Sequence, residues 1–109
     1  MREIYLEGSN VRDIVNFLSD NYANRGRVLR EIDGHQFGVF VWDKYYIRVY
    51  GSVSATTIYE SSDPSRAHIQ VIGSGGRYGP LTLGSESSIE EEVLLGIKEY
   101  ANSQNLSIK

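Results

Sequence analysis

The sequence predicts an α+β fold in which an antiparallel sheet of five or six strands carries an N-terminal and a C-terminal helix on one face. Two segments with helical spacing of apolar residues lie near the two ends of the chain, and strand-like segments separated by turns follow one another between them. Consecutive strands without intervening helices pair antiparallel, whereas a parallel sheet needs a crossover helix. With 109 residues, the chain is expected to form a single domain, 1–109, that buries a core without disulfides.

The N-terminal part predicts a strand followed by a helix. Ile4 and Leu6 alternate with polar or amphipathic residues over 2–7, which is typical of a half-buried strand. Helical spacing follows in Val11, Ile14, Val15, Leu18 and Tyr22. Gly26 is expected to end this helix in a left-handed conformation.

The middle of the chain predicts an antiparallel meander. Strands are expected over 28–32, 36–42, 45–50, 53–60 and 67–72, with residues 80–83 as a further short edge strand. The pair Asp33-Gly34 predicts a two-residue hairpin turn, because both positions tolerate positive φ. The pair Asp43-Lys44 is predicted as a second turn of the same length.

These two turns determine which side chains share a face of the sheet. One predicted face carries Leu29, Phe40, Trp42, Tyr45, Ile47 and Val49. The other carries Val28, Ile32, Phe37, Val39, Val41, Tyr46 and Tyr50, interrupted by Arg30, His35 and Arg48. Both faces are apolar, whereas a sheet with one face in water alternates cleanly.

The helices can cover only one of these faces. Two helices packed side by side cover about four strands. The second face therefore needs another cover, which is a second copy of the chain, closure of a curled sheet, or a bound ligand. The alternative is that the exposed Tyr and Val residues are present only because they favour strands.

A C-terminal helix is predicted over 88–103. Ser87 with Glu90, or Ser88 with Glu91, has the spacing of a capping box. The buried stripe is expected to comprise Ile89, Val93, Leu94, Ile97, Tyr100 and Ala101. The glutamates 90–92 are expected to form a solvated first turn, where they favour the positive end of the helix dipole.

The glycine-rich segment between the last long strand and this helix is the candidate ligand site. Successive backbone N–H groups of Gly73, Ser74, Gly75 and Gly76 could bind an anion, with Arg77 pairing to phosphate or carboxylate. The segment lacks the third glycine of a dinucleotide-binding motif and the Gly-Lys-Ser/Thr of a P-loop. The alternative is a flexible connection without a ligand.

Nucleic-acid binding and catalysis are not expected. The net charge of −3 argues against general affinity for nucleic acid or anionic membranes. In Phe37-Gly38-Val39-Phe40-Val41 the two aromatic residues fall on opposite faces, so they do not form an RNA-stacking platform. No cysteine is present, His35 and His68 lack ligand spacing, and no serine motif suggests a nucleophile. We predict no catalytic residue, no metal site and no cofactor.

The sequence therefore predicts a small cytoplasmic, non-enzymatic binding or assembly module that forms a homodimer through the open sheet face. The expected interface residues are Val39, Val41, Tyr46, Arg48 and Tyr50. Tyrosine and arginine are enriched at subunit interfaces. The alternative function is a binding domain or an enzyme that binds a small anionic ligand with the glycine-rich loop 73–79. No membrane-spanning segment is expected, because no apolar run approaches about 20 residues.

Overall fold

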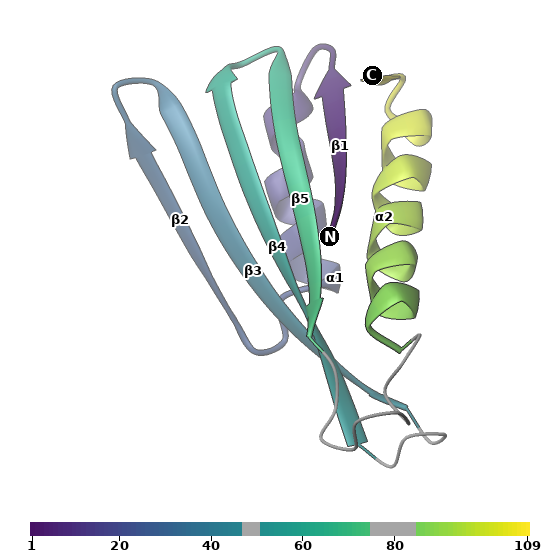
Figure 1. Ribbon diagram of the computed structural model, residues 1–109. Helices are drawn as coiled ribbons and strands as arrows, with labels where there is room; N and C mark the ends of the chain where they lie inside the picture. Colours follow the sequence, from purple (N-terminus) through teal and green to yellow (C-terminus); the bar gives the residue numbers. More distant parts are fainter. Residues whose placement is uncertain (47–50, 75–84) are drawn as a thin grey trace.

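The computed structural model describes residues 1–46, 51–74 and 85–109, which form a six-stranded antiparallel sheet with two helices packed against it (Figure 1). In chain order the elements are β1 (Arg2–Glu7), a 3₁₀ turn (Val11–Asp13), α1 (Ile14–Asn21), β2 (Gly26–Ile32), β3 (His35–Tyr46), β4 (Gly51–Asp63), β5 (Arg66–Ser74), α2 (Ser85–Ser103) and β6 (Ser107–Ile108). The predicted α+β class and antiparallel sheet are confirmed.

The sheet order is β2-β3-β4-β5-β1-β6. The strands β2 to β5 form an antiparallel meander as predicted, but with four strands in place of five, because Tyr45 and Tyr46 belong to β3 and do not begin a separate strand at 45–50. The strand β1 pairs antiparallel with β5, the last strand of the meander. The short strand β6, which was not predicted, pairs with the end of β1. As Figure 1 shows, β2 therefore lies at one border of the sheet and the β1/β6 pair at the other.

The core lies between the helices and one face of the sheet. Ile4 and Leu6 of β1 are buried, as are Ile69 and Val71 of β5. These residues occupy alternate strand positions whose side chains point toward the helices, whereas the residues between them point to the opposite face. The largest fully buried side chains of the sheet are Tyr59 and Phe40. The helices contribute the buried residues Ile14, Val15, Leu18, Ile89, Val93, Ile97 and Ala101, which belong to the two predicted stripes.

The β2–β3 hairpin has the predicted register. Asp33 and Gly34 adopt φ values of 51° and 82°, as a two-residue turn with positive φ at both positions requires. Ile32 lies opposite His35, and Val28 lies opposite Val39.

The predicted turn at Asp43-Lys44 is wrong, because β3 continues through it to Tyr46. The side chain of Asn24 takes the place of a neighbouring strand: its Oδ1 accepts the Asp43 N–H at 2.9 Å, and its Nδ2 donates to the Asp43 carbonyl at 3.0 Å. Lys44 extends to Glu92 of α2, with Nζ 2.7 Å from Oε1. Since the strand does not reverse at this point, Tyr45 shares a face with Val39 and not with Trp42.

Both helices also differ from the prediction at one end. The helix α1 stops at Asn21, where the Tyr22 N–H donates to the Leu18 carbonyl, and Gly26 instead begins β2 with φ of 149°. The helix α2 begins at Ser85, so the predicted capping boxes lie inside it. The predicted edge strand at 80–83 lies outside the described residues.

Candidate functional site

The candidate site is the open face of the sheet, which we define as the face opposite the helices. On β3 it contains residue 37 and every second residue to 45, and the strand registers extend it across the neighbouring strands. Residues of this face are exposed or half-buried, whereas their neighbours Phe40, Tyr59 and Ile69 on the helix side are fully buried. The face therefore has no cover among the described residues.

The β2–β3 end of the open face is apolar. Its hairpin patch, which we define as Val28, Ile32, Phe37 and Val39, has exposed fractions of 51%, 61%, 39% and 37%. Val28, Val39 and Ile58 lie side by side in register across β2, β3 and β4. A hollow of about 280 Å³ lies over them, with Arg30 and Glu60 also in its lining. An exposed, contiguous apolar surface of this kind is typical of interaction sites.

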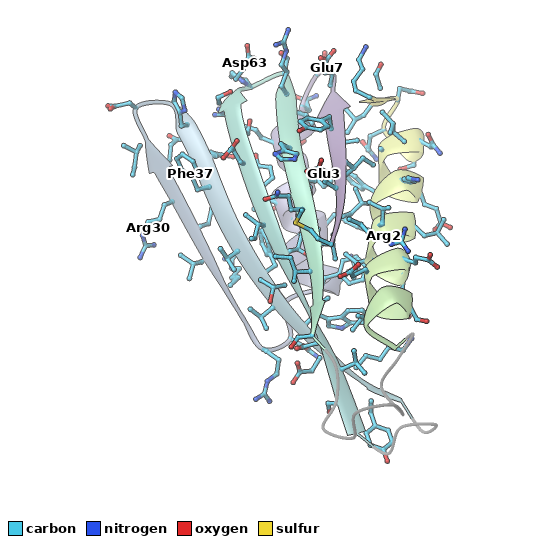
Figure 2. The ribbon with its side chains drawn as sticks, in the orientation of Figure 1. Arg2, Glu3, Glu7, Arg30, Phe37 and Asp63 are labelled. Carbon is cyan, nitrogen blue, oxygen red and sulfur yellow. The ribbon has the colours of Figure 1, made fainter. Side chains whose placement is uncertain are left out.

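The hairpin patch is exposed because it lies on the face opposite the helices, and most of the helix side of β2 is exposed as well. The helix α2 packs over β5, β4 and β1, and α1 approaches β3. Six of the seven residues of β2 are exposed, and only Leu29 is half-buried. Figure 2 shows Phe37 on the β2–β3 hairpin and Arg30 at the outer margin of the molecule. The helical layer thus covers little of β2: on its helix side Leu29 packs partly against the core and Arg27 reaches Ser19 of α1.

The opposite end of the open face is polar. The rings of Tyr5 on β1 and His68 on β5 stack with centroids 4.2 Å apart and an interplanar angle of 5°. His68 Nε2 lies 3.1 Å from Glu3 Oε2, so this carboxylate orients the imidazole. A groove of about 430 Å³ next to this cluster is lined by Tyr5, His68, Glu60, Arg66, Lys109 and other residues of the strand ends.

The charges of this groove are largely compensated by one another. Glu7 lies between two cations, with its carboxylate 3.6 Å from Arg66 and 3.7 Å from Lys109. Within the described part of the chain, no group of three or more His, Asp or Glu residues could hold a metal ion. The cluster of Glu3, Tyr5 and His68 was not predicted, because the sequence does not reveal that β1 pairs with β5. The alternation of residues 2–7 did place Glu3 and Tyr5 on one face.

The predicted interface residues are only partly described. Val39 and Val41 lie on the open face, as expected from the first hairpin. The backbone of Tyr46 pairs with Gly51, but its side chain lies outside the described residues, as do Arg48 and Tyr50 entirely. Tyr45, which was predicted for the other face, lies on the open face and is exposed.

The glycine-rich segment is described only at its start. The N–H of Gly73 donates to Glu90 Oε2 at 2.7 Å, and Ser74 is the last residue of β5. Glu90 is only 8% exposed, so the prediction that it lies in a solvated first turn is wrong. Gly75, Gly76 and Arg77 lie outside the described residues. The first amide of the predicted anion site thus binds a carboxylate of the protein itself.

Burial raises the pKa values of three tyrosine hydroxyls, those of Tyr22, Tyr59 and Tyr100. The pKa of Tyr59 is raised mainly by desolvation, while its hydroxyl donates to Gln36 Oε1 at 2.9 Å. The pKa of Tyr22 is also raised, first by desolvation and then by the negative charges of Glu92 and Glu99. The shifts at Tyr59 and Tyr22 keep the phenol neutral, and both groups lie on the helix side of the sheet rather than on the open face.

Within the described residues, no helix combines the length and the hydrophobicity needed to cross a membrane.

Comparison with known proteins finds no relative. No family model, no curated protein and no solved structure matches the chain.

Proposed function

We propose that the protein is a small, non-enzymatic assembly module that self-associates through the open face of its sheet. The observation that carries this proposal is the hairpin patch, in which four large apolar side chains remain exposed beside the half-buried Ile58. An antiparallel sheet can leave one face in water, but that face is then normally polar. A symmetric contact with a second copy is the commonest way to bury such a surface.

Burial of the hairpin patch supplies part of the free energy of association. Full burial of a Val, Ile or Phe side chain contributes about 1.5–3 kcal/mol relative to full exposure. The four side chains of the hairpin patch are about half exposed, so each contributes about 1 kcal/mol on further burial. A symmetric contact buries the patch of both copies and doubles this gain. Loss of rotational and translational freedom costs at least about 4 kcal/mol. The patch alone therefore supports association only near millimolar concentration, and association at micromolar concentration needs further contacts over the rest of the open face.

The polar end of the open face supports a binding role more than a catalytic one. Its carboxylates and cations pair with one another, as Glu7 does with Arg66 and Lys109. Such pairs are typical of the polar rim around an apolar interface. The absence of cysteine from the sequence supports the cytoplasmic location that we propose with this function.

Val39→Asp tests the proposal at the centre of the patch. Val39 lies between Val28 and Ile58, so an aspartate there would be buried against apolar side chains on association. Leu95→Asp is the matched control, because Leu95 is 58% exposed on α2, away from the open face. Masses from light scattering and sedimentation equilibrium at tens of micromolar should show association for the wild type and Leu95→Asp and its loss for Val39→Asp.

Two results would count against this function. One is a wild-type protein that remains a monomer over the whole concentration range. The other is a Val39→Asp variant that associates as strongly as the wild type. Circular dichroism and thermal unfolding of each variant establish that the comparison is between folded proteins.

The alternative function, binding of a small anion by the loop 73–79, has less support. The Gly73 amide is already bonded to Glu90, which would have to move before an external anion could bind there. Titration with inorganic phosphate, followed by the amide NMR signals of Gly73 and Ser74, tests it. Saturable shifts at low millimolar phosphate or below would favour this alternative.

A further inference from the structure

The border strand β2 leaves one edge of the sheet open. It is the outermost strand in the order β2-β3-β4-β5-β1-β6, and no described strand lies beyond it (Figure 1). The opposite border is different, because β6 pairs with β1 and the Lys109 N–H donates to the Tyr5 carbonyl at 2.8 Å. An unpaired edge presents backbone N–H and C=O groups that can pair with another strand.

The hairpin turn determines which backbone groups of β2 point outward. In a two-residue hairpin, the residues flanking the turn exchange hydrogen bonds with each other, and hydrogen-bonded pairs then alternate with pairs that are not. Since Ile32 and His35 flank the turn, the backbone groups of Arg27, Leu29 and Glu31 point away from β3. The Leu29 carbonyl accordingly accepts a hydrogen bond from the Arg30 guanidinium, at 3.2 Å, in place of a strand neighbour.

The strand β2 lacks most of the features that usually prevent edge pairing, although it carries charged residues. Natural edges are protected by charged side chains, above all lysine, by proline, by bulges or by very short strands. The segment Gly26–Ile32 contains no proline or lysine, spans seven residues and pairs with β3 in unbroken register. Its charged residues therefore decide whether a second copy is repelled or accepted.

The geometry points to edge-to-edge pairing of β2 with the β2 strand of a second copy, antiparallel, with Leu29 opposite Leu29 of the partner subunit. In this register Arg27 lies opposite Glu31 of the partner subunit, and the two-fold symmetry creates this pair of opposite charges twice. Both residues lie on the helix side of the strand, flanking Leu29, so opposed side chains meet on one face. Opposite charges directly across two strands stabilise the pairing.

The charges select this register over its neighbours. If Arg30 in place of Leu29 lies on the two-fold axis, Arg30 lies opposite Arg30 of the partner subunit, and these like charges destabilise the pairing. If Val28 lies on the axis, Arg27 lies opposite Leu29 of the partner subunit, so both ion pairs are lost and fewer residues of the two strands pair. In the selected register Arg30 lies opposite Val28 of the partner subunit, where its methylene groups can cover the valine.

The present contacts of the two residues do not block this pairing. The Arg27 guanidinium donates to Ser19 Oγ at 2.8 Å, and Glu31 Oε1 lies 3.8 Å from Arg12 and accepts from Gln36 at 3.2 Å. Both Arg27 and Glu31 are exposed. A carboxylate has two oxygens and several lone pairs, so Glu31 can keep its partners and bind an additional guanidinium.

This edge contact goes beyond the proposed function, because it uses the backbone edge of β2 and not the open face. Its two-fold axis is perpendicular to the sheet, so the helices of both copies lie on the same side and the two hairpin patches lie next to each other. Both contacts together predict an assembly of four chains. The edge contact alone predicts a dimer with its open face still exposed.

Charge reversal tests the edge contact. Arg27→Glu and Glu31→Arg each replace both ion pairs by like charges, and each should weaken edge association at least about tenfold. An equimolar mixture of the two variants should associate again, because every opposed position then carries opposite charges. The double variant Arg27→Glu/Glu31→Arg should also associate. Arg30→Glu is the matched control, since it reverses a charge on the same strand that faces no charge of the partner subunit.

Sedimentation equilibrium distinguishes the two contacts. If both exist, the wild type forms tetramers, either Val39→Asp or Arg27→Glu leaves dimers, and their combination gives monomers. If only the edge contact exists, the wild type is a dimer that Arg27→Glu dissociates and Val39→Asp does not. Single reversals that leave the mass unchanged, or a mixture of the two variants that fails to associate, would overturn the edge proposal without affecting the open-face proposal.

Discussion

Gly96 of α2 provides a quantitative test of how the helices pack against the sheet, because two well-known effects oppose each other there. Replacing a glycine by alanine inside a helix normally stabilises it by about 1 kcal/mol. Gly96 lies in the interior of α2, so helix propensity alone predicts that Gly96→Ala increases the free energy of unfolding.

The structure predicts the opposite sign. A Cβ atom at Gly96 would overlap the hydroxyl oxygen of Tyr22 and lie 3.1 Å from its Cζ. The Tyr22 ring cannot move aside freely, since it is in edge contact with Trp42 at 5.0 Å and with Phe17 at 5.8 Å between centroids. Overpacking of this kind costs about 1–3 kcal/mol. Subtracting the propensity gain, we expect Gly96→Ala to lower the free energy of unfolding by about 1 kcal/mol.

Tyr22→Phe supplies the matched background, because it removes the atom that would overlap. In this background Gly96→Ala should lose most of its penalty, which gives a coupling energy of about 1–2 kcal/mol in the double-mutant cycle. Urea unfolding can be followed by the fluorescence of Trp42, which is the single tryptophan of the chain and contacts Tyr22 directly. A Gly96→Ala variant that is more stable than the wild type, with the same gain in both backgrounds, would refute the packing argument.

Two further predictions concern hydrogen bonds of the β4–β5 hairpin. Glu90→Ala removes the acceptor of the Gly73 N–H and should lower the free energy of unfolding by about 2 kcal/mol in urea titrations. Glu90→Gln keeps a side-chain oxygen and should lower it less. Equal losses for the two variants would contradict this role of Glu90. The pKa of Asp63 is lowered by hydrogen bonds from the Ser65 N–H and hydroxyl, so its stabilising effect is present above the unfolded-state pKa near 3.8 and is lost as the pH falls through the lower folded-state pKa. The stability difference between the wild type and Asp63→Ala should therefore shrink in acid, and a pH-independent difference would contradict it.

The parts of the fold that could be predicted from sequence are those determined by local rules. The Asp33-Gly34 turn sets the register of β2 and β3, because few other residue pairs adopt positive φ at both turn positions. That one register correctly placed Val28, Phe37 and Val39 on one face and Leu29 and Phe40 on the other. The buried stripes of the two helices could also be predicted from local sequence, since the spacing of apolar residues alone identifies the buried side of a helix.

The errors arose where a distant residue replaces a local signal. Asp43-Lys44 has turn-forming composition, yet β3 continues because Asn24 pairs with the Asp43 backbone and Glu92 binds Lys44. Nothing near residue 43 in the sequence indicates that Asn24 will lie beside it. Glu90 was misplaced for the same reason: its carboxylate binds the Gly73 N–H, 17 residues away in the chain, and the N-terminal ammonium of Met1 at 3.2 Å.

The candidate site combines both kinds of information. Which residues share the open face follows from the hairpin turn, but their exposure depends on which side of the sheet the helices pack. The helix α2 packs over β1, β4 and β5, near the border where β1 pairs with β5 and away from β2. Without the placement of β1 and the helices, the sequence predicts only that one face remains uncovered, and not which strands of the other face are covered.

The same turn also connects the hairpin patch with the edge of β2. Since side chains alternate between faces and backbone groups alternate between edges, the residues with apolar side chains on the open face, Val28 and Ile32, direct their N–H and C=O groups toward β3. The outward backbone groups belong instead to Arg27, Leu29 and Glu31, whose side chains lie on the helix side. A second copy that pairs with the edge therefore leaves Ile32, Phe37 and Val39 of the hairpin patch available, and it touches the patch only where Arg30 of the partner subunit lies beside Val28.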